Sequence, residues 1–285
     1  QVNVALAIGV EKFTDQYGPL SEAAWSLSTD SDYEAMQGTT PNAQAALVMR
    51  RYMHEFGVGH EAFAGFAITA HANAVHNPHA MYHSPISLET YNSAGLVSEP
   101  LNIFDLAPVA DGAAAVVLTR PDLLPRETPH PLVHVTGSSL VTDRLALHDR
   151  RDVLAFDAAR VSVQRACRQA GILPGDVDLF ELCDSYSIYA ALSLETAGFA
   201  LRGQGWQFAS PDKIGLQGLL PIATFGGMKA RGNPGGAAGL YQAVEAALQL
   251  RGQAGENQVP GATRALVQML AGPASTAVTH VLEVR

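Results

Sequence analysis

The sequence is poor in cysteine and in basic residues, and long apolar runs are absent. Two cysteines, Cys167 and Cys183, occur among 285 residues, too few for the disulfide framework of a small secreted domain. They fit a reducing compartment, so we expect a cytoplasmic protein. Lysine and arginine number 18 against 27 acidic residues, and a net charge of −9 argues against nonspecific nucleic-acid binding. No stretch suits a membrane span or a secretory leader, and we expect neither.

Nucleotide-binding and metal-binding signatures are also missing. The glycine-rich stretch has neither the spacing of a dinucleotide fingerprint nor the Lys-Ser/Thr ending of a P-loop. Six histidines occur between residues 54 and 83, but none has the His-Glu-x-x-His spacing, and Pro78 interrupts the local helix pattern. We therefore expect no metal, and histidines that are solvated or locally hydrogen-bonded: His54, His60, His71, His76, His79 and His83.

What the chain does contain is an alternation of apolar strands and amphipathic helices. This order predicts an α/β fold with mostly parallel sheets. The predicted strands cover residues 2–10, 113–118, 132–137, 177–182, 264–270 and 275–284, the first two of them buried. The predicted helices cover residues 43–56, 61–75, 87–92, 157–170 and 188–197, and one more follows the glycine-rich loop as far as Arg251.

Residues 119–131 contain four prolines and form the best candidate for a domain boundary. They divide the chain into a part at 1–125 and a part at 126–285. The chain opens inside an apolar strand at residues 2–10, where domains seldom begin. We therefore expect that further sequence precedes it in the natural protein.

The stretch from Gly226 to Tyr241 holds six glycines and runs into a helix. Glycine lets backbone come close to a ligand, and a helix amino terminus favours an oxygen with negative character. The stretch thus suits a polarised carbonyl, a phosphate or a thioester oxygen. A tight corner whose glycines serve only packing remains the alternative.

The predicted strand at 177–182 delivers polar side chains at its carboxyl end: Cys183, Asp184, Ser185 and Tyr186. Each has a plainer alternative role. Cys183 can be a small buried hydrophobe, Asp184 can cap the following helix, and Tyr186 can anchor that helix.

Five blocks, at residues 4–12, 108–118, 226–232, 249–255 and 279–283, resemble the thiolase superfamily in order, specifically its lipid-transfer (sterol-carrier) and archaeal acetyl-CoA acetyltransferase types. The resemblance covers nearly the whole chain. It implies a five-layer αβαβα fold of two similar halves, the first incomplete here, with a loop domain inserted around residues 20–100. Residues 1–125 would be the remainder of the first half and residues 126–285 the second half. It also implies a homodimer.

The resemblance further implies coenzyme A thioesters as substrates, no tightly bound cofactor, and a possible small zinc-ribbon/OB-fold partner that binds acyl-CoA. The family's nucleophilic cysteine would precede the strand at 2–10 and lie outside this sequence. At the other catalytic positions the chain departs from the family. Gly-His-Pro is here Gly232-Asn233-Pro234, His-Asp-Ala-Phe is here Cys183-Asp184-Ser185-Tyr186, and the late cysteine block carries Met269.

These substitutions change the chemistry that we expect. A carboxamide cannot act as the base that histidine provides, although the NH₂ of Asn233 can donate to an oxyanion. Family members that cleave β-hydroxyacyl-CoA by a retro-aldol reaction are similar in relying on tyrosines. We therefore expect this reaction, with Tyr186 as acid/base, Asp184 positioning or deprotonating it, Asn233 at the thioester carbonyl and Cys183 in the same pocket.

Three residues are candidates for binding coenzyme A: Gly227, Lys229 and Arg231. For the lysine and the arginine, exposure to solvent or a structural ion pair is the alternative. Two other functions stay open. One is thiolase-type acyl transfer with an upstream cysteine, and the other is a non-catalytic subunit that binds acyl-CoA or lipid.

Overall fold

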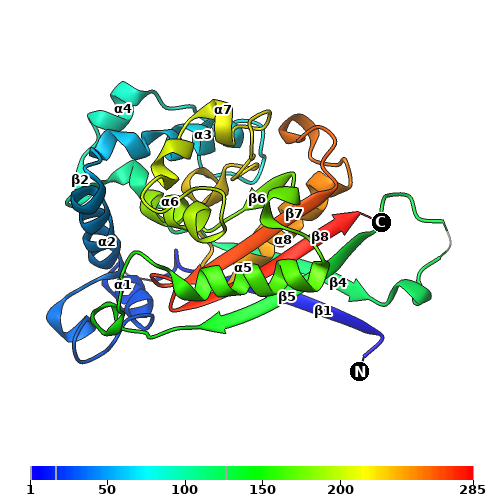
Figure 1. The fold of residues 1–285 in the computed structure, drawn as a ribbon, viewed down its shortest axis with the longest axis horizontal. Helices are drawn as coiled ribbons and strands as arrows, with labels where there is room; N and C mark the ends of the chain where they lie inside the picture. The colour runs from blue at the N-terminus through cyan, green and yellow to red at the C-terminus, as the bar shows by residue number, and fades with distance from the viewer. Residues whose placement is uncertain (1, 17, 126, 285) are drawn as a thin grey trace.

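The computed structural model describes residues 2–16, 18–125 and 127–284 (Figure 1). Its largest sheet has four strands in the order β5-β8-β7-β6, and a second sheet pairs β1 with β4. The strands are β1 (Val4–Glu11), β4 (Gly112–Thr119), β5 (Val133–Thr142), β6 (Leu179–Glu181), β7 (Arg264–Ala271) and β8 (Thr276–Val284), with a small hairpin of β2 (Leu96–Ser98) and β3 (Leu101–Asn102).

The expectation of mostly parallel sheets is wrong. Among the described strands only β6 and β7 pair in parallel, whereas β1–β4, β2–β3, β5–β8 and β7–β8 are antiparallel. The turn at residues 272–275 is too short for a crossover, so β7 and β8 can only be antiparallel neighbours. Alternation of strands and helices along the sequence does not by itself fix strand direction.

The helices are α1 (Gly18–Ser26), α2 (Pro41–Phe56), α3 (Ala64–Ala74), α4 (Leu88–Asn92), α5 (Asp157–Ala170), α6 (Ser187–Thr196), α7 (Pro211–Ile214) and α8 (Ala238–Leu250). Six of them lie close to their predicted positions, whereas α1 and α7 were not predicted. Helix α2 begins earlier than predicted because Thr40 caps it, its hydroxyl accepting from the Ala43 amide, with Pro41 in the first helical position. Gly57 ends it in the left-handed conformation.

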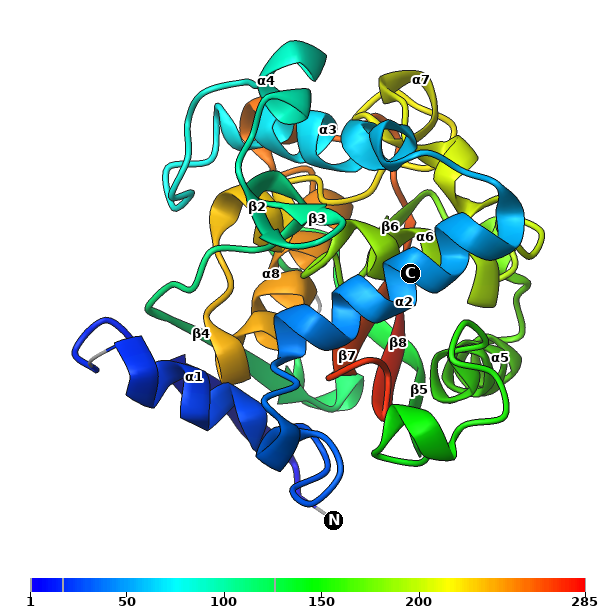
Figure 2. The same cartoon turned by 90° about the vertical axis from the view of Figure 1, so that its left-hand side faces the viewer.

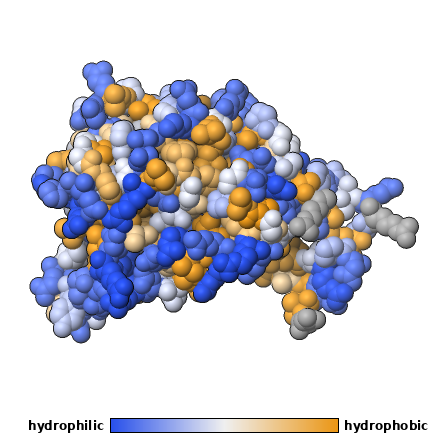
Figure 3. All heavy atoms as spheres, in the orientation of Figure 1, coloured by the Kyte–Doolittle hydropathy of each residue, from blue (hydrophilic) through white to orange (hydrophobic). Residues whose placement is uncertain are grey.

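Helix α8 lies between the two sheets, and α5 covers the other face of the four-stranded sheet on β5 and β8 (Figure 1). These contacts give the layer order β–α–β–α and confirm the α/β class. Figure 3 shows hydrophilic side chains along α5, as an amphipathic surface helix requires, and apolar side chains in the middle of the same face. No helix in the described ranges is long and apolar enough to cross a membrane.

The first two strands are not buried as predicted: Val117 of β4 is 68% exposed, and β1 shows the reason. Large side chains of β1 point outward, among them Leu6 and Ile8, each 60% exposed, while the small Ala5, Ala7 and Gly9 face α8. A Cβ on Gly9 would stand 2.8 Å from the Cα of Ala237. Close approach of the helix therefore selects small residues on the inner face and leaves the large apolar residues outside.

Helices α1 to α4 and the β2–β3 hairpin all belong to the connection between β1 and β4 (Figure 2). Helices α2 and α3 pack on α6, so this connection covers the end of the four-stranded sheet. The boundary predicted near residues 125 and 126 falls in the connection between β4 and β5. Arg126 lies outside the described residues, and the division into two parts stays a prediction.

The packing of α3 yields a stability test. A Cβ on Gly65 would lie 1.9 Å from the carbonyl oxygen of Ala209, whereas one on Gly59 would meet open space. We expect Gly65→Ala to lower the free energy of unfolding by about 2 kcal/mol or more, since overpacking outweighs the helix preference of alanine. Gly59→Ala is the matched control and should change it by less than about 1 kcal/mol. Urea unfolding measures both, and equal stabilities would contradict the close packing.

Candidate active site

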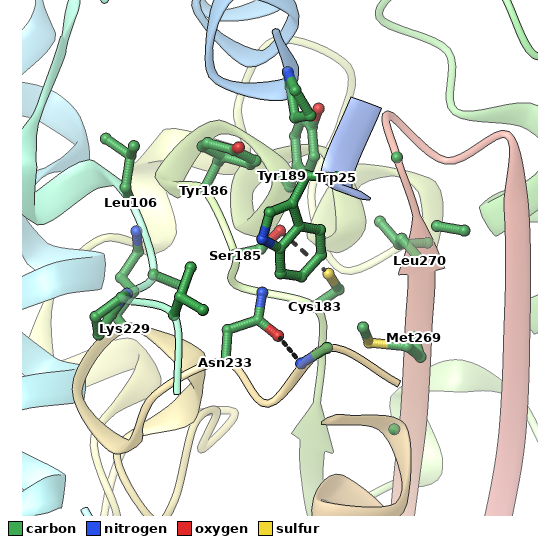
Figure 4. Close-up of a pocket in the computed structure, with 18 of the residues that line it drawn as sticks. Trp25, Leu106, Cys183, Ser185, Tyr186, Tyr189, Lys229, Asn233, Met269 and Leu270 are labelled. Atoms are coloured by element: carbon green, nitrogen blue, oxygen red, sulfur yellow. Dashed lines mark hydrogen bonds between the residues drawn. The ribbon is translucent and has the colours of Figure 1, made fainter. Parts of the chain in front are cut away.

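A cavity of about 1220 Å³ opens where the carboxyl end of β6, the glycine-rich loop, the first turn of α2 and residues 103–109 meet (Figure 4). Most of its lining is apolar, with a few polar groups among it. The polar side chains nearest the predicted site are those of Asn42, Gln44, Cys183, Ser185, Tyr186, Tyr189, Lys229 and Asn233. Such a cavity suits a ligand that is largely apolar and carries a few polar atoms.

Tyr186 and Tyr189 stand at the start of α6 and face the cavity. Their rings contact edge to face, with centroids 4.9 Å apart, and the Tyr186 hydroxyl donates to Oδ1 of Asn42 at 2.7 Å. Burial raises the pKa of Tyr189 well above its ordinary value, so that hydroxyl stays protonated. The Cys183 sulfur lies 3.4 Å from the Ser185 hydroxyl, and burial raises the pKa of this thiol too.

Asp184 lies behind the cavity lining and is 2% exposed. Its carboxylate accepts from the amide of Met228 at 2.7 Å and from that of Lys229 at 3.4 Å. It thus caps the turn at residues 227–231, not helix α6, which has no side-chain cap. Gly227 has φ +54°, and a Cβ there would stand 2.2 Å from Oδ2 of Asp184, so this contact requires glycine. Burial raises the pKa of Asp184, and the nearby Lys229 counteracts the rise.

Asn233 follows this turn and is fixed through its backbone. Its amide donates to the carbonyl of Pro108 at 2.8 Å, and its carbonyl accepts from the amide of Ala110 at 3.1 Å. The side-chain oxygen accepts from the Gly235 amide at 3.2 Å, which assigns the carboxamide orientation. The NH₂ group therefore points toward the cavity, on the side of Ser185 (Figure 4).

An extended segment at residues 106–110 joins the two loops, and the sequence analysis did not predict it. The Ala107 amide donates to the carbonyl of Ser185 at 2.9 Å, and Leu106 pairs with Tyr186 in an isolated bridge. Beyond the turn at Pro108, no periodic pattern marks this segment. Its backbone holds the Tyr186 loop and the Asn233 loop in one register.

Lys229 and Arg231 are buried, at 1% and 3% exposed. Lys229 lines the cavity, but its amine donates to the carbonyl of Asp105 at 2.6 Å, and burial lowers its pKa to about 8. Arg231 shows the structural ion pair, its Nε 3.2 Å from Glu245 and its guanidinium over the Tyr241 ring. Neither Gly227 nor Arg231 lines the cavity, so the arrangement assigns these residues to the support of the loop and does not favour contact with coenzyme A phosphates.

Asp105 anchors the segment that Lys229 holds. Its carboxylate lies 2.6 Å from Nε2 of His60 and accepts from the Tyr91 hydroxyl at 2.6 Å. His71 stacks on Tyr82, and Nδ1 of His76 lies 3.1 Å from the Glu256 carboxylate, so at least three of the six histidines have side-chain partners. Within residues 2–16, 18–125 and 127–284 no three His, Cys, Asp or Glu side chains are grouped as a metal site.

Comparison with known proteins identifies the family to which this fold belongs. Residues 139–284 match the family model described as thiolase C-terminal domain-like. Acetyl-CoA acetyltransferase of Methanothermobacter thermautotrophicus is 37% identical over 98% of this chain and 72% of its own length. The chain belongs to the thiolase superfamily. Sterol carrier protein 2 of Bos taurus, another member matched, is 28% identical over 92% of this chain and 50% of its own length.

Solved thiolase-superfamily structures agree with the fold. The Ltp2-ChsH2(DUF35) aldolase superposes with a TM-score of 0.84 at 25% identity, over 99% of this chain and 72% of that one. Human mitochondrial 3-ketoacyl-CoA thiolase gives a TM-score of 0.68 at 15% identity, over 99% and 72%, which supports the fold alone. Both sequence relatives and both structures extend beyond the part that this chain covers.

The buried amine of Lys229 predicts how the free energy of unfolding depends on pH. Its pKa is lowered from 10.5 to about 8 in the fold, so between these values the unfolded chain binds more protons than the folded one. Stability due to this amine therefore rises from pH 8 to pH 10.5 and is lost as pH falls through 8. We expect the wild type to gain about 3 kcal/mol over Lys229→Met across this window, at about 1.4 kcal/mol per pKa unit.

Urea unfolding at several pH values measures this difference. Lys213→Met, which removes a partly exposed amine, controls for the loss of a lysine. Parallel stability curves for the wild type and Lys229→Met would show that the buried amine does not titrate in this range.

Proposed function

We propose that this thiolase-superfamily chain cleaves the Cα–Cβ bond of a β-hydroxyacyl-CoA by a retro-aldol reaction. The observation that carries the proposal is the Tyr186–Tyr189 pair in one cavity with a carboxamide, Asn233, in place of a basic imidazole. In the reaction the β-hydroxyl loses its proton and becomes a carbonyl. The Cα–Cβ bond breaks, and its electron pair forms the thioester enolate. Protonation of that enolate releases a shorter acyl-CoA.

The side chains of the site suit different steps of this reaction. The NH₂ of Asn233 is placed to donate to the thioester oxygen, where negative charge develops. Tyr186 exchanges the proton of the substrate hydroxyl, and Tyr189 stays a neutral donor because burial raises its pKa. Asp184 positions the Asn233 loop. Burial also raises the pKa of the Cys183 thiol, which disfavours the thiolate that a nucleophile requires.

The comparisons with known proteins support this proposal at the level of the fold and the family. The aldolase with a TM-score of 0.84 shares this fold, and its name includes a DUF35 component. We propose acyl-CoA as the substrate, with no tightly bound cofactor, a partner subunit of that kind, a homodimeric assembly and a cytoplasmic location. The second candidate function is acyl transfer, favoured by the name of the 37% identical relative. It would require a nucleophile and a base other than Asn233.

The first test removes the tyrosine hydroxyl. Tyr186→Phe should lower kcat on a β-hydroxyacyl-CoA about 10²- to 10⁴-fold, the usual contribution of a general acid–base group, with a small change in KM. Tyr33→Phe, at a residue 70% exposed, is the control. Coupled release of the shorter acyl-CoA measures the rate. If the protein cleaves β-ketoacyl-CoA and Tyr186→Phe does so at the same rate, acyl transfer would be supported instead. Binding of acyl-CoA without turnover would support a non-catalytic subunit.

The second test keeps the loop and changes the donor. Asn233→Asp retains an oxygen that can accept from the Gly235 amide, but it replaces the NH₂ with a negative charge beside the developing enolate. We expect kcat to fall about 10²- to 10³-fold, as for loss of an oxyanion donor. Steady-state kinetics with circular dichroism separates this effect from misfolding. A folded Asn233→Asp variant with an unchanged kcat would remove Asn233 from the mechanism.

A further inference from the structure

We propose that Gln44, in the first turn of α2, forms a polar subsite for a second oxygen on the acyl group, a hydroxyl or keto oxygen beyond the reacting β-carbon. The proposal rests on the proposed function only in assigning this cavity to the acyl group. It does not depend on the retro-aldol step.

Gln44 combines burial with an unused amide. It lines the cavity and is 1% exposed, and neither its Oε1 nor its Nε2 has a hydrogen-bond partner among the described residues. A buried polar group left unpaired costs about 1–3 kcal/mol. Other buried amides of the chain are used: Asn73, Asn77 and Asn257 all donate to backbone carbonyls. Gln44 therefore offers a donor and an acceptor to whatever enters the cavity.

The start of α2 adds to the preference for oxygen. The helix is 16 residues long, and its first residues, Pro41 and Asn42, also line the cavity. The amino end of a helix carries partial positive charge, which favours an acceptor oxygen nearby. Gln44 contributes the specific hydrogen bonds that the helix end alone lacks.

Two neighbouring polar side chains of the cavity are already engaged. Asn42 accepts from Tyr186, and the oxygen of Asn233 accepts from the Gly235 amide. The lining near α2 also includes Leu106 and the rings of Trp25 and Tyr189. The Trp25 Nε1 has no partner among the described residues either, but it can only donate, whereas the Gln44 amide can donate and accept. A plain alkyl chain would thus leave the Gln44 amide unpaired, whereas an oxygenated chain would pair it. The expected discrimination is about tenfold to a hundredfold, the size of one unpaired buried group.

Binding measurements on the full chain test the subsite. The probes are octanoyl-CoA and a series of octanoyl-CoAs that carry one hydroxyl or keto oxygen at successive carbons beyond the β-carbon. We expect the wild type to bind at least one oxygenated probe about tenfold or more tightly than octanoyl-CoA by calorimetry. Gln44→Met, similar in length and without the amide, should lose that preference and bind octanoyl-CoA at least as well.

Gln253→Met removes an exposed glutamine and should keep the preference. Gln44→Leu repeats the test with a second apolar side chain if the methionine variant is unstable. Equal binding of all probes by the wild type would mean that the amide holds only water, and the proposal would fall. A preference that survives in both Gln44 variants would overturn it as well.

Kinetics on the same proteins keeps the two proposals apart. Tyr186→Phe should lower turnover and leave the preference for the oxygenated probe intact, because Gln44 is untouched. Gln44→Met should reduce the preference in binding and KM with a smaller effect on kcat. Discrimination without any cleavage would retain the subsite and reject the aldolase, and cleavage without discrimination would do the reverse.

Discussion

The site depends on one buried carboxylate. Asp184 ends the β6 region and accepts from the amides of Met228 and Lys229, so it ties the strand that delivers Tyr186 to the loop that delivers Asn233. The contact requires glycine at position 227, because a side chain there would collide with the carboxylate. Burial excludes water from the carboxylate, and hydrogen bonds to it are stronger in such an interior than in water. Residues 106–110 then pair with both loops and complete the frame.

The buried carboxyl groups around this frame lie in surroundings that disfavour their negative charge. Burial raises the pKa of Glu181 and of Asp184, and it raises that of Glu245 to about 8. Glu245 lies 3.2 Å from Arg231, which favours ionisation, while its burial opposes it. Burial has the larger effect, because the 5% exposed carboxyl has little water to stabilise its charge. The Arg231–Glu245 pair therefore gains little from charge attraction, and Arg231 holds the loop mainly through its hydrogen bond to the Gly227 carbonyl and its packing on Tyr241.

Local patterns in the sequence predicted much of the fold and some of the site. Helix α5 has its predicted bounds because Gly171 ends a strongly amphipathic run, and the strand-end and loop motifs that carry Tyr186 and Asn233 do face one cavity. The predicted strand direction was wrong because it depends on pairing between segments that are distant in the sequence. Asn42 and Gln44 were missed because their roles arise where α2 meets residues some 140 positions later, which no local pattern encodes.

The substitutions in this chain form a consistent set. Asn233 stands where the resemblance places the family's histidine, and the Cys183 thiol is buried with a raised pKa, which disfavours a thiolate. Tyr189 is likewise held neutral, and the Lys229 amine is turned to backbone carbonyls. In the proposed site, Tyr186, Asn233 and Gln44 provide neutral donors and acceptors along the cavity. In the proposed reaction, fixed hydrogen bonds from such groups would stabilise the negative charge that develops on the enolate oxygen, and in the proposed subsite they would discriminate acyl groups by where these carry oxygen.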